Sequence, residues 1–252
     1  MSRKPERSRV EWIDEGSVGS RRRPADAPAP SRRRSRGGSK SLRALDTVIE
    51  EFEKTLGKKA APRAIKRYEA ALLPFEAHRY DEARKILLPM AREYEGVAAV
   101  HEMLGLCLYR AGNWAAASRE LERALELNPR WIFNHAVLAD CHRAIKNYDR
   151  VDELWEELAA ASPNAEIVAE GRIVLAGSLA DRGDLEAALS AMATARSDNS
   201  RPAEHHLRQW YVIADLHDRL GDVIQARNFF ERVVRHDPSF ADVVERLSSL
   251  GA

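Results

Sequence analysis

The sequence has few cysteines and no long apolar segment, and these absences exclude several classes of protein. It contains 2 cysteines in 252 residues, which excludes a disulfide-stapled framework and fits a reducing compartment. The segment MSRKPERSRVEWIDEG at the start has no apolar core of the length that a secretory signal needs. No apolar run approaches the roughly 18 residues of a membrane-spanning helix. We therefore expect a soluble, cytoplasmic protein that does not bind a membrane.

The motifs of common active sites are also missing. The sequence contains no GxxxxGK[ST], no GxGxxG and no GxSxG. Cys107 and Cys141 are 34 residues apart, as are His101 and His135, and none of these spacings is that of a paired metal site. We interpret the cysteines as small buried residues at equivalent positions. No catalytic residue, metal ligand or cofactor is predicted, and we expect the protein not to be an enzyme.

The net charge of +1 is the balance of two unlike segments. Residues 1–40 hold 12 lysines and arginines against 5 acidic residues, whereas the remainder holds 28 against 34. Few apolar side chains, with several prolines and glycines, predict that residues 1–40 are a disordered basic tail. Clustered arginines attract nucleic-acid phosphates, acidic partners or the chain's own acidic body, and a merely solubilising tail is the alternative. The candidate phosphate-binding or acidic-partner residues are Arg21, Arg22, Arg23, Arg32, Arg33, Arg34 and Arg36.

Residues 41–63 are predicted to form an amphipathic helix and a linker. Leu45, Phe52 and Leu56 share one face at helical spacing. The helix should end near Gly57, and Pro62 suits the first position of the next helix. The apolar face must pack on the rest of the chain or on a partner.

A repeat of 34 to 38 residues fills the rest of the sequence. Each copy has a short turn, a bulky residue, a small or slim residue three positions later and a large apolar residue four positions after that. A large residue followed by a small one recurs upstream, as in Leu104–Gly105 and Leu138–Ala139, and allows two antiparallel helices to approach closely. The copies are HRYDEARKIL (78–87), GNWAAASREL (112–121), KNYDRVDELW (146–155), GDLEAALSAM (183–192) and GDVIQARNFF (221–230).

These columns resemble the tetratricopeptide repeat. The resemblance implies an all-α fold, a right-handed α-solenoid of about five helix pairs with a C-terminal capping helix, following the disordered basic tail. The second unit matches most fully, while Pro74 and His78 make the first one degenerate. The implied repeat domain is 64–252, with units near 64–97, 98–131, 132–165, 169–202 and 207–240 and a cap at 241–250.

The same resemblance implies a non-catalytic scaffold or adaptor that binds a peptide or a partner helix on its concave face. The lysines and asparagines with which some family members bind a C-terminal carboxylate are missing from the corresponding columns. The inward positions hold seven acidic residues, four arginines and several aromatics, which would suit an extended peptide with basic and apolar side chains. Alternatively, these acids pair with neighbouring arginines. The candidate groove residues are Tyr68, Leu72, Phe75, Glu76, Glu102, Leu106, Tyr109, Arg110, Phe133, Asp140, Arg143, Glu170, Ile173, Asp181, Arg208, Tyr211, Asp215, Asp218 and Arg219.

A second functional class stays open at this point. A nucleic-acid-associated adaptor would bind RNA or DNA through the basic tail and a protein through the solenoid. No aromatic residue lies within 16–41, so such binding would be mainly electrostatic.

Overall fold

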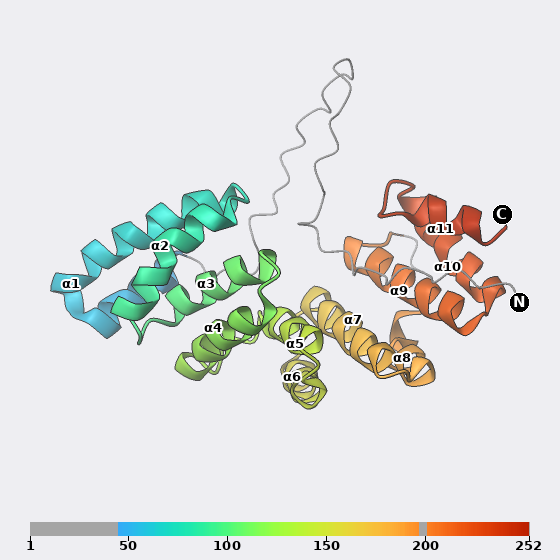
Figure 1. Ribbon diagram of the computed structural model, residues 1–252, viewed down its shortest axis with the longest axis horizontal. Coiled ribbons are helices and arrows are strands. Elements are labelled where there is room, and N and C mark those ends of the chain that lie inside the picture. Colours follow the sequence, from blue (N-terminus) through green and yellow to red (C-terminus); the bar gives the residue numbers. More distant parts are fainter. Residues whose placement is uncertain (1–44, 197–200, 252) are drawn as a thin grey trace, which may run out of the picture. The chain divides into compact units, whose positions relative to one another are not determined.

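A computed structural model describes residues 45–196 and 201–251 (Figure 1). These residues form eleven α-helices and one short 3₁₀ helix, with no strand among them, so the predicted all-α class is confirmed. The predicted tail and its arginines lie outside the described residues. The helices are α1 (Leu45–Glu76), α2 (Tyr80–Glu93), α3 (Ala98–Arg110), α4 (Trp114–Leu127), α5 (His135–Ala144), α6 (Tyr148–Ala161), α7 (Ala165–Asp181), α8 (Leu185–Ala191), α9 (Glu204–Leu220), α10 (Val223–His236) and α11 (Val243–Ser249), and the 3₁₀ helix is Ala193–Ala195.

The helices form successive antiparallel pairs. The second half of α1 pairs with α2, and α3 with α4, α5 with α6, α7 with α8 and α9 with α10. Each second helix also packs on the first helix of the next pair, and the first helices α1, α3, α5, α7 and α9 contact one another in that order. The helix α11 packs on α10 at the end. This arrangement confirms the predicted solenoid of five helix pairs with a C-terminal helix.

The helix α1 is interrupted at Gly57. This residue has φ 76° and ψ 153°, a backbone conformation that glycine adopts easily and that no helix contains. The sequence analysis expected the first helix to end here. Pro62 lies inside the helix that follows, not at its first position as we had expected, so it leaves one carbonyl of the preceding turn without its usual donor.

The segment before Gly57 packs on the first pair of the solenoid. Phe52 is fully buried and its ring lies edge-on to Tyr68, with 5.6 Å between the ring centres, and to Tyr94. The carboxylate of Glu51 accepts a hydrogen bond from the backbone N–H of Ala99 (3.2 Å), at the start of α3. The apolar face that the sequence left without an assigned neighbour therefore covers the beginning of the solenoid core.

The turn inside each pair has a repeated construction. Gly112, Gly183 and Gly221 have φ between 71° and 90°, which allows the chain to reverse. The next residue caps the second helix: Asp184, for example, accepts a hydrogen bond from the N–H of Ala187 (2.9 Å). The three positions of this turn therefore have separate roles. The glycine adopts the left-handed conformation, the asparagine or aspartate is the N-cap, and the bulky residue is the first residue of the second helix.

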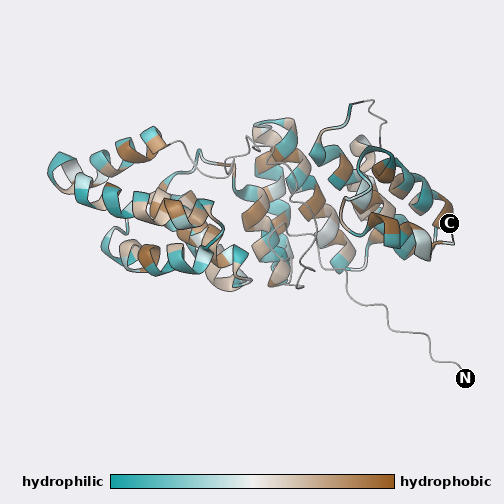
Figure 2. Cartoon of the chain, turned by 90° about the horizontal axis from the view of Figure 1, so that it is seen from above, coloured by the Kyte–Doolittle hydropathy of each residue, from teal (hydrophilic) through white to brown (hydrophobic). Residues whose placement is uncertain are grey.

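Apolar and polar residues alternate along each helix (Figure 2). The largest buried side chains are Trp210, Phe52, Phe230, Leu87 and Met90. Each helix buries one stripe against its partner and another against the next pair, and one cluster of buried apolar residues runs from Val48 in α1 to Leu154 in α6. As a result, the polar side chains of the first helices are brought to a common face.

Candidate functional site

We define the first-helix face as the candidate groove residues, nearly all of which lie on the first helices α1, α3, α5, α7 and α9. Its centre is a ladder of hydrogen bonds. The hydroxyl of Tyr109 donates to Asp140 Oδ2 (2.9 Å). Arg143 donates through Nε to Asp140 Oδ1 (2.9 Å) and through Nη1 to Asp181 Oδ2 (2.9 Å). The ladder joins α3, α5 and α7, so these side chains are held by fixed partners.

Two further arginines on this side of the molecule each join two carboxylates. Arg208 on α9 contacts Glu170 on α7 (3.3 Å) and Glu204 on its own helix (2.9 Å). A third group of this kind closes the solenoid, where Arg246 of α11 donates to Asp215 (2.7 Å) and Asp218 (3.1 Å) of α9.

Burial is the largest influence on the Arg246 guanidinium and lowers its pKa, but the hydrogen bond to Asp215 and the charges of Asp215, Tyr211 and Asp218 together outweigh burial and raise that pKa. Three times, then, one arginine is shared by two carboxylates, as the alternative of paired acids anticipated.

The candidate groove residues fall into three groups by exposure. Six are buried in the core and therefore support the face from behind: Tyr68, Phe75, Glu102, Leu106, Tyr211 and Asp215. Nine are partly exposed: Leu72, Tyr109, Phe133, Asp140, Arg143, Glu170, Ile173, Arg208 and Asp218. Four are exposed: Glu76, Arg110, Asp181 and Arg219.

The buried polar members hold neighbouring segments in place. Glu102, only 1% exposed, accepts hydrogen bonds from Trp131 Nε1 (2.9 Å) and Asn134 Nδ2 (2.8 Å), which ties the loop before α5 to α3. The Tyr211 hydroxyl donates to Asp242, just before α11. Burial and this hydrogen bond both raise the pKa of Tyr211. Each contact therefore links one unit to the next.

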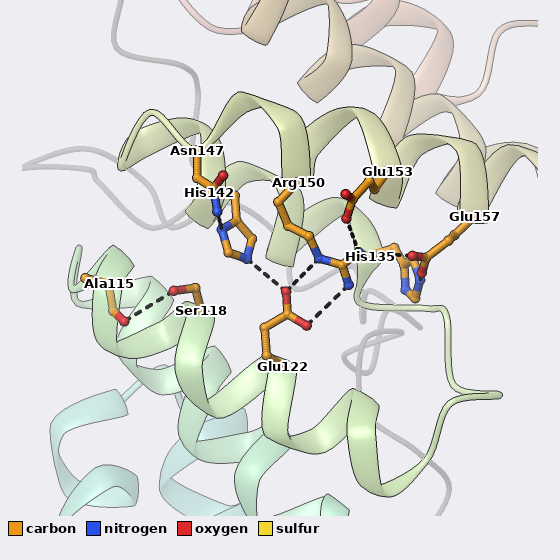
Figure 3. A network of polar contacts seen from close by, with 9 residues as sticks. All are labelled: Ala115, Ser118, Glu122, His135, His142, Asn147, Arg150, Glu153 and Glu157. Carbon is orange, nitrogen blue, oxygen red and sulfur yellow. Dashed lines mark hydrogen bonds and ion pairs between the residues drawn. The ribbon is translucent and has the colours of Figure 1, made fainter.

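A second polar network joins the second and third pairs on the side of the second helices (Figure 3). Glu122 on α4 accepts hydrogen bonds from His142 Nε2 on α5 (3.0 Å) and from Arg150 Nε on α6 (2.9 Å). Asn147 Nδ2 can only donate, so His142 Nδ1 accepts from it (3.2 Å) and the ring proton is on Nε2. Arg150 also contacts Glu153 (2.9 Å) and so extends the network along α6.

Burial and hydrogen bonding have opposite effects on the pKa of Glu122, the carboxylate at the centre of this network. Burial alone would raise the pKa of Glu122, but the hydrogen bonds from His142 and Arg150 outweigh it and lower the pKa to about 2. The repeat pattern gave no sign of this network, because Glu122 and Arg150 do not stand in a repeated column. A helical-wheel comparison of adjacent units would have placed both residues on facing helices.

Both cysteines and the equivalent histidines His101 and His135 are buried. Cys107 and Cys141 are buried free thiols, as predicted. Burial raises the pKa of Cys107 to about 12 and also raises that of Cys141, which favours the neutral thiol over the nucleophilic thiolate. His101 and His135 are buried and hydrogen-bonded to Glu120 (2.7 Å) and Glu157 (2.8 Å). Within the part of the chain that the structure describes, no three side chains are grouped as metal ligands.

None of the helices described between residues 45 and 251 combines the length with the apolar character that a bilayer crossing needs.

The arrangement is found in known proteins. The sequence profile of the tetratricopeptide repeat matches residues 98–131 and 207–240, which are the second and fifth units. No curated protein sequence matches the chain.

Among solved structures, a thermophilic tetratricopeptide repeat protein from Thermus thermophilus, TTC0263, has a TM-score of 0.54 and 15% identity, covering 74% of this chain and 98% of its own. YrrB, described as a tetratricopeptide repeat protein with an unusual peptide-binding site, has a TM-score of 0.48 and 16% identity over 81% and 97%. The Naa15/Naa10 complex bound to HypK-THB has a TM-score of 0.34 and 17% identity over 82% and 38%. With the repeat columns, the five helix pairs and the matched units in agreement, the chain is a tetratricopeptide repeat protein.

Proposed function

We propose that this protein is a non-catalytic adaptor that binds a peptide or a partner helix on the first-helix face. The observation that carries the proposal is the ladder from Tyr109 through Asp140 and Arg143 to Asp181, which holds polar side chains of three helices in one arrangement. A surface whose rotamers are already fixed loses little side-chain entropy when a ligand binds. Scaffold proteins need such a surface, and an enzyme needs in addition a reactive group.

The side chains of the described residues favour binding over catalysis. The two thiols have raised pKa values and the buried histidines are engaged by glutamates. The free thiols also fit the reducing cytoplasm, which is the location that we propose.

Affinity capture with matched variants tests the adaptor proposal. Glu76 and Arg110 are exposed members of the face, and replacing both with alanine should remove captured partners without unfolding the chain. The control replaces Glu126 and Glu156, exposed residues of α4 and α6 on the second helices, and should retain them. Equal capture by the two variants would refute the assignment of the face.

The alternative adaptor uses nucleic acid, and it depends on the arginines at 21–23 and 32–34, outside the described residues. Six Arg→Ser replacements in the full chain should then abolish binding to a single-stranded RNA or a DNA duplex at low salt. Undiminished binding in that variant, or no binding in the unmodified chain, leaves only the protein-binding function.

A further inference from the structure

The second helix of the fourth unit is shorter than those of the other units. The helix α8 has 7 residues, whereas α2, α4, α6 and α10 have 14 each. Because the two helices of a pair are antiparallel, the residues that α8 lacks are those that would lie beside the first half of α7 (Figure 1). After α8 the chain is held elsewhere: the carbonyl oxygens of Ala195 and Arg196 accept hydrogen bonds from Trp210 Nε1 (3.1 Å) on α9 and Arg232 Nη1 (2.8 Å) on α10.

The first half of α7 carries a row of side chains that we call the α7 stripe. Val168, Arg172 and Leu175 are four and three residues apart, which places them on one face of the helix. All three are partly exposed. The equivalent residues of the second unit, where the second helix is complete, are buried with exposed fractions of 0%, 7% and 0%: Val97, His101 and Leu104. The fourth unit therefore leaves open a surface that the second unit covers.

The repeat column of Arg172 shows what this surface lacks. In the first three units the column holds a basic residue that pairs with a glutamate on the second helix of its own unit. These pairs are Arg67 with Glu93 on α2, His101 with Glu120 on α4 (2.7 Å) and His135 with Glu157 on α6 (2.8 Å). The fifth unit has Trp210 in this column, which needs no acid. In the fourth unit the basic residue is present, but the half-helix that would carry the glutamate is not.

Arg172 is a partly buried cation without an acid. Among residues 45–196 and 201–251 no carboxylate is paired with it, and burial lowers the pKa of its guanidinium. The guanidinium lies over the ring of Trp155 on α6, 5.6 Å from the ring centre. A guanidinium stacked on a ring keeps its N–H donors at its edge, where a carboxylate can accept two of them. A carboxylate brought by a ligand would therefore stabilise Arg172 in its present position.

We propose that the α7 stripe binds an amphipathic helix of a partner protein, with one glutamate or aspartate on the apolar face of that helix. The partner helix takes the place that the second halves of α2, α4 and α6 occupy in their own units. Its apolar side chains pack on Val168 and Leu175, and its carboxylate binds Arg172. None of these three residues belongs to the first-helix face, so this is a second binding surface.

The test uses three stapled helical peptides of about ten residues, or roughly three turns. The peptides share leucines along one face and differ at one central position of that face, which holds glutamate, glutamine or lysine. Binding to the full chain is measured by fluorescence anisotropy at physiological salt. We expect the glutamate peptide to bind about tenfold more tightly than the lysine peptide, with the glutamine peptide between them. No binding of any peptide, or equal affinity for the glutamate and lysine peptides, would overturn the inference.

A charge reversal locates the binding. Arg172→Glu should reverse the order, so that the lysine peptide binds about fivefold more tightly than the glutamate peptide. The control Arg119→Glu makes the same change of net charge at an exposed position of α4 and should keep the original order. The basic tail is the same in both variants, so its attraction for an acidic peptide does not distinguish them. The original order in both variants would overturn the inference. If circular dichroism shows that Arg172→Glu loses helix, Arg172→Gln replaces it and should abolish the preference between the two peptides.

The apolar part of the contact is tested at Val168. Val168→Gln should weaken binding of the glutamate peptide about fivefold, because a buried methyl contact is lost and a polar group is placed in the interface. Ile224→Gln makes the same kind of exchange on α10, at a residue that is 73% exposed, and should change the affinity less than about twofold. Equal losses in the two variants would contradict docking on the α7 stripe.

The connection after α8 is the other possible occupant of this surface. Its first acidic residue is Asp198, which lies outside the described residues. If the glutamate peptide binds only after Asp198→Asn, the chain itself supplies the carboxylate and the proposed partner is wrong. Unchanged affinity for the glutamate peptide in Asp198→Asn supports a carboxylate brought by a partner.

Discussion

Two helix contacts depend on a glycine, one inside the second pair and one between the third and fourth pairs. They differ in what a larger residue would meet. In the second pair, a Cβ on Gly105 would lie 2.7 Å from Leu121 Cγ and 3.2 Å from its backbone nitrogen. At the junction, a Cβ on Gly171 would lie 2.3 Å from Leu158 Cδ2, the end of a side chain that can turn aside. Packing inside a unit involves backbone, whereas packing between units at this place involves a movable methyl group.

The two contacts also differ in whether their residues recur in every repeat. Gly105 stands in the column occupied by Ala139 in the next unit, because every pair needs a small residue where its helices approach. Gly171 stands in no such column, and neither do Glu122 and Arg150, which join the second and third pairs. Contacts within a unit recur, while contacts between units depend on which two units meet.

The largest effect is expected from Gly105→Ala. The new methyl group cannot be accommodated without moving α4, so the free energy of unfolding should fall by about 3 kcal/mol. Chemical denaturation followed by circular dichroism measures it. The matched control is Ala139→Gly, which removes a methyl group from the same column and should cost about 1 kcal/mol through helix propensity. A loss for Gly105→Ala no larger than that of the control would contradict backbone-limited packing inside the unit.

Glu122→Gln probes the polar contact between units. We expect a loss of about 2 kcal/mol at neutral pH, because a charged acceptor for His142 and Arg150 becomes neutral. The pKa of Glu122 lies below its ordinary value, so its stabilising contribution is present above that ordinary value and disappears as pH falls toward 2. Denaturation from pH 7 down to acid should therefore show the two proteins converging in stability. The control Glu126→Gln, at an exposed position, should differ little from the unmodified protein at any pH.

Gly171→Ala should have a smaller effect, a loss of about 1 kcal/mol, because Leu158 can rotate and alanine favours the helix. The coupling to Leu158 is measured with a double-mutant cycle that includes Leu158→Ala. In that background the added methyl group fills space instead of clashing, and the loss should vanish or reverse. A cost that persists without the leucine would show that Gly171 is needed for another reason.

The smallest effect is expected at the turns. Lys146 has φ 63° at the position where the second, fourth and fifth units have glycine, and a non-glycine residue is strained there. Lys146→Gly should raise the free energy of unfolding by about 0.5 kcal/mol after the entropy of glycine is subtracted. The reverse exchange, Gly112→Lys, should lower it by a similar amount, about 0.5 kcal/mol. Thermal denaturation of both variants checks the opposite signs.

The predicted helix pairs were confirmed because each repeat column has a local task. The glycine and the N-cap of each turn act within four residues, and the small residue of each pair acts across a single helix contact. The position of Pro62 was predicted wrongly, because the helix after Gly57 already includes residues before Pro62 and the preference of proline for a first helical position did not set this boundary. The order of the units and the helix after them could also be read from the periodicity.

The sequence predicted which residues stand at the inward positions of the first helices, but not which of them are exposed and which are buried. The register of the repeat placed Asp140, Arg143 and Asp181 on neighbouring first helices, and the structure brings them within hydrogen-bonding distance. The register could not distinguish these exposed or partly exposed residues from Glu102 and Asp215, which occupy inward columns of the repeat but are buried. Burial depends on the loop before α5 and on α11, neither of which belongs to a repeat column.

The sequence by itself determined that the chain consists of five helix pairs, with few cysteines, no catalytic motif and two segments of opposite charge. Periodic spacing carries this information because the 3.6-residue helix and the tight turn act over short distances. The tertiary structure alone decided which charges meet: Arg143, Arg208 and Arg246 each contact two carboxylates, and Glu122 accepts hydrogen bonds from His142 and Arg150. Ion pairs depend on distances of a few ångströms between helices that are some 30 residues apart in sequence, and no spacing along the chain fixes those distances.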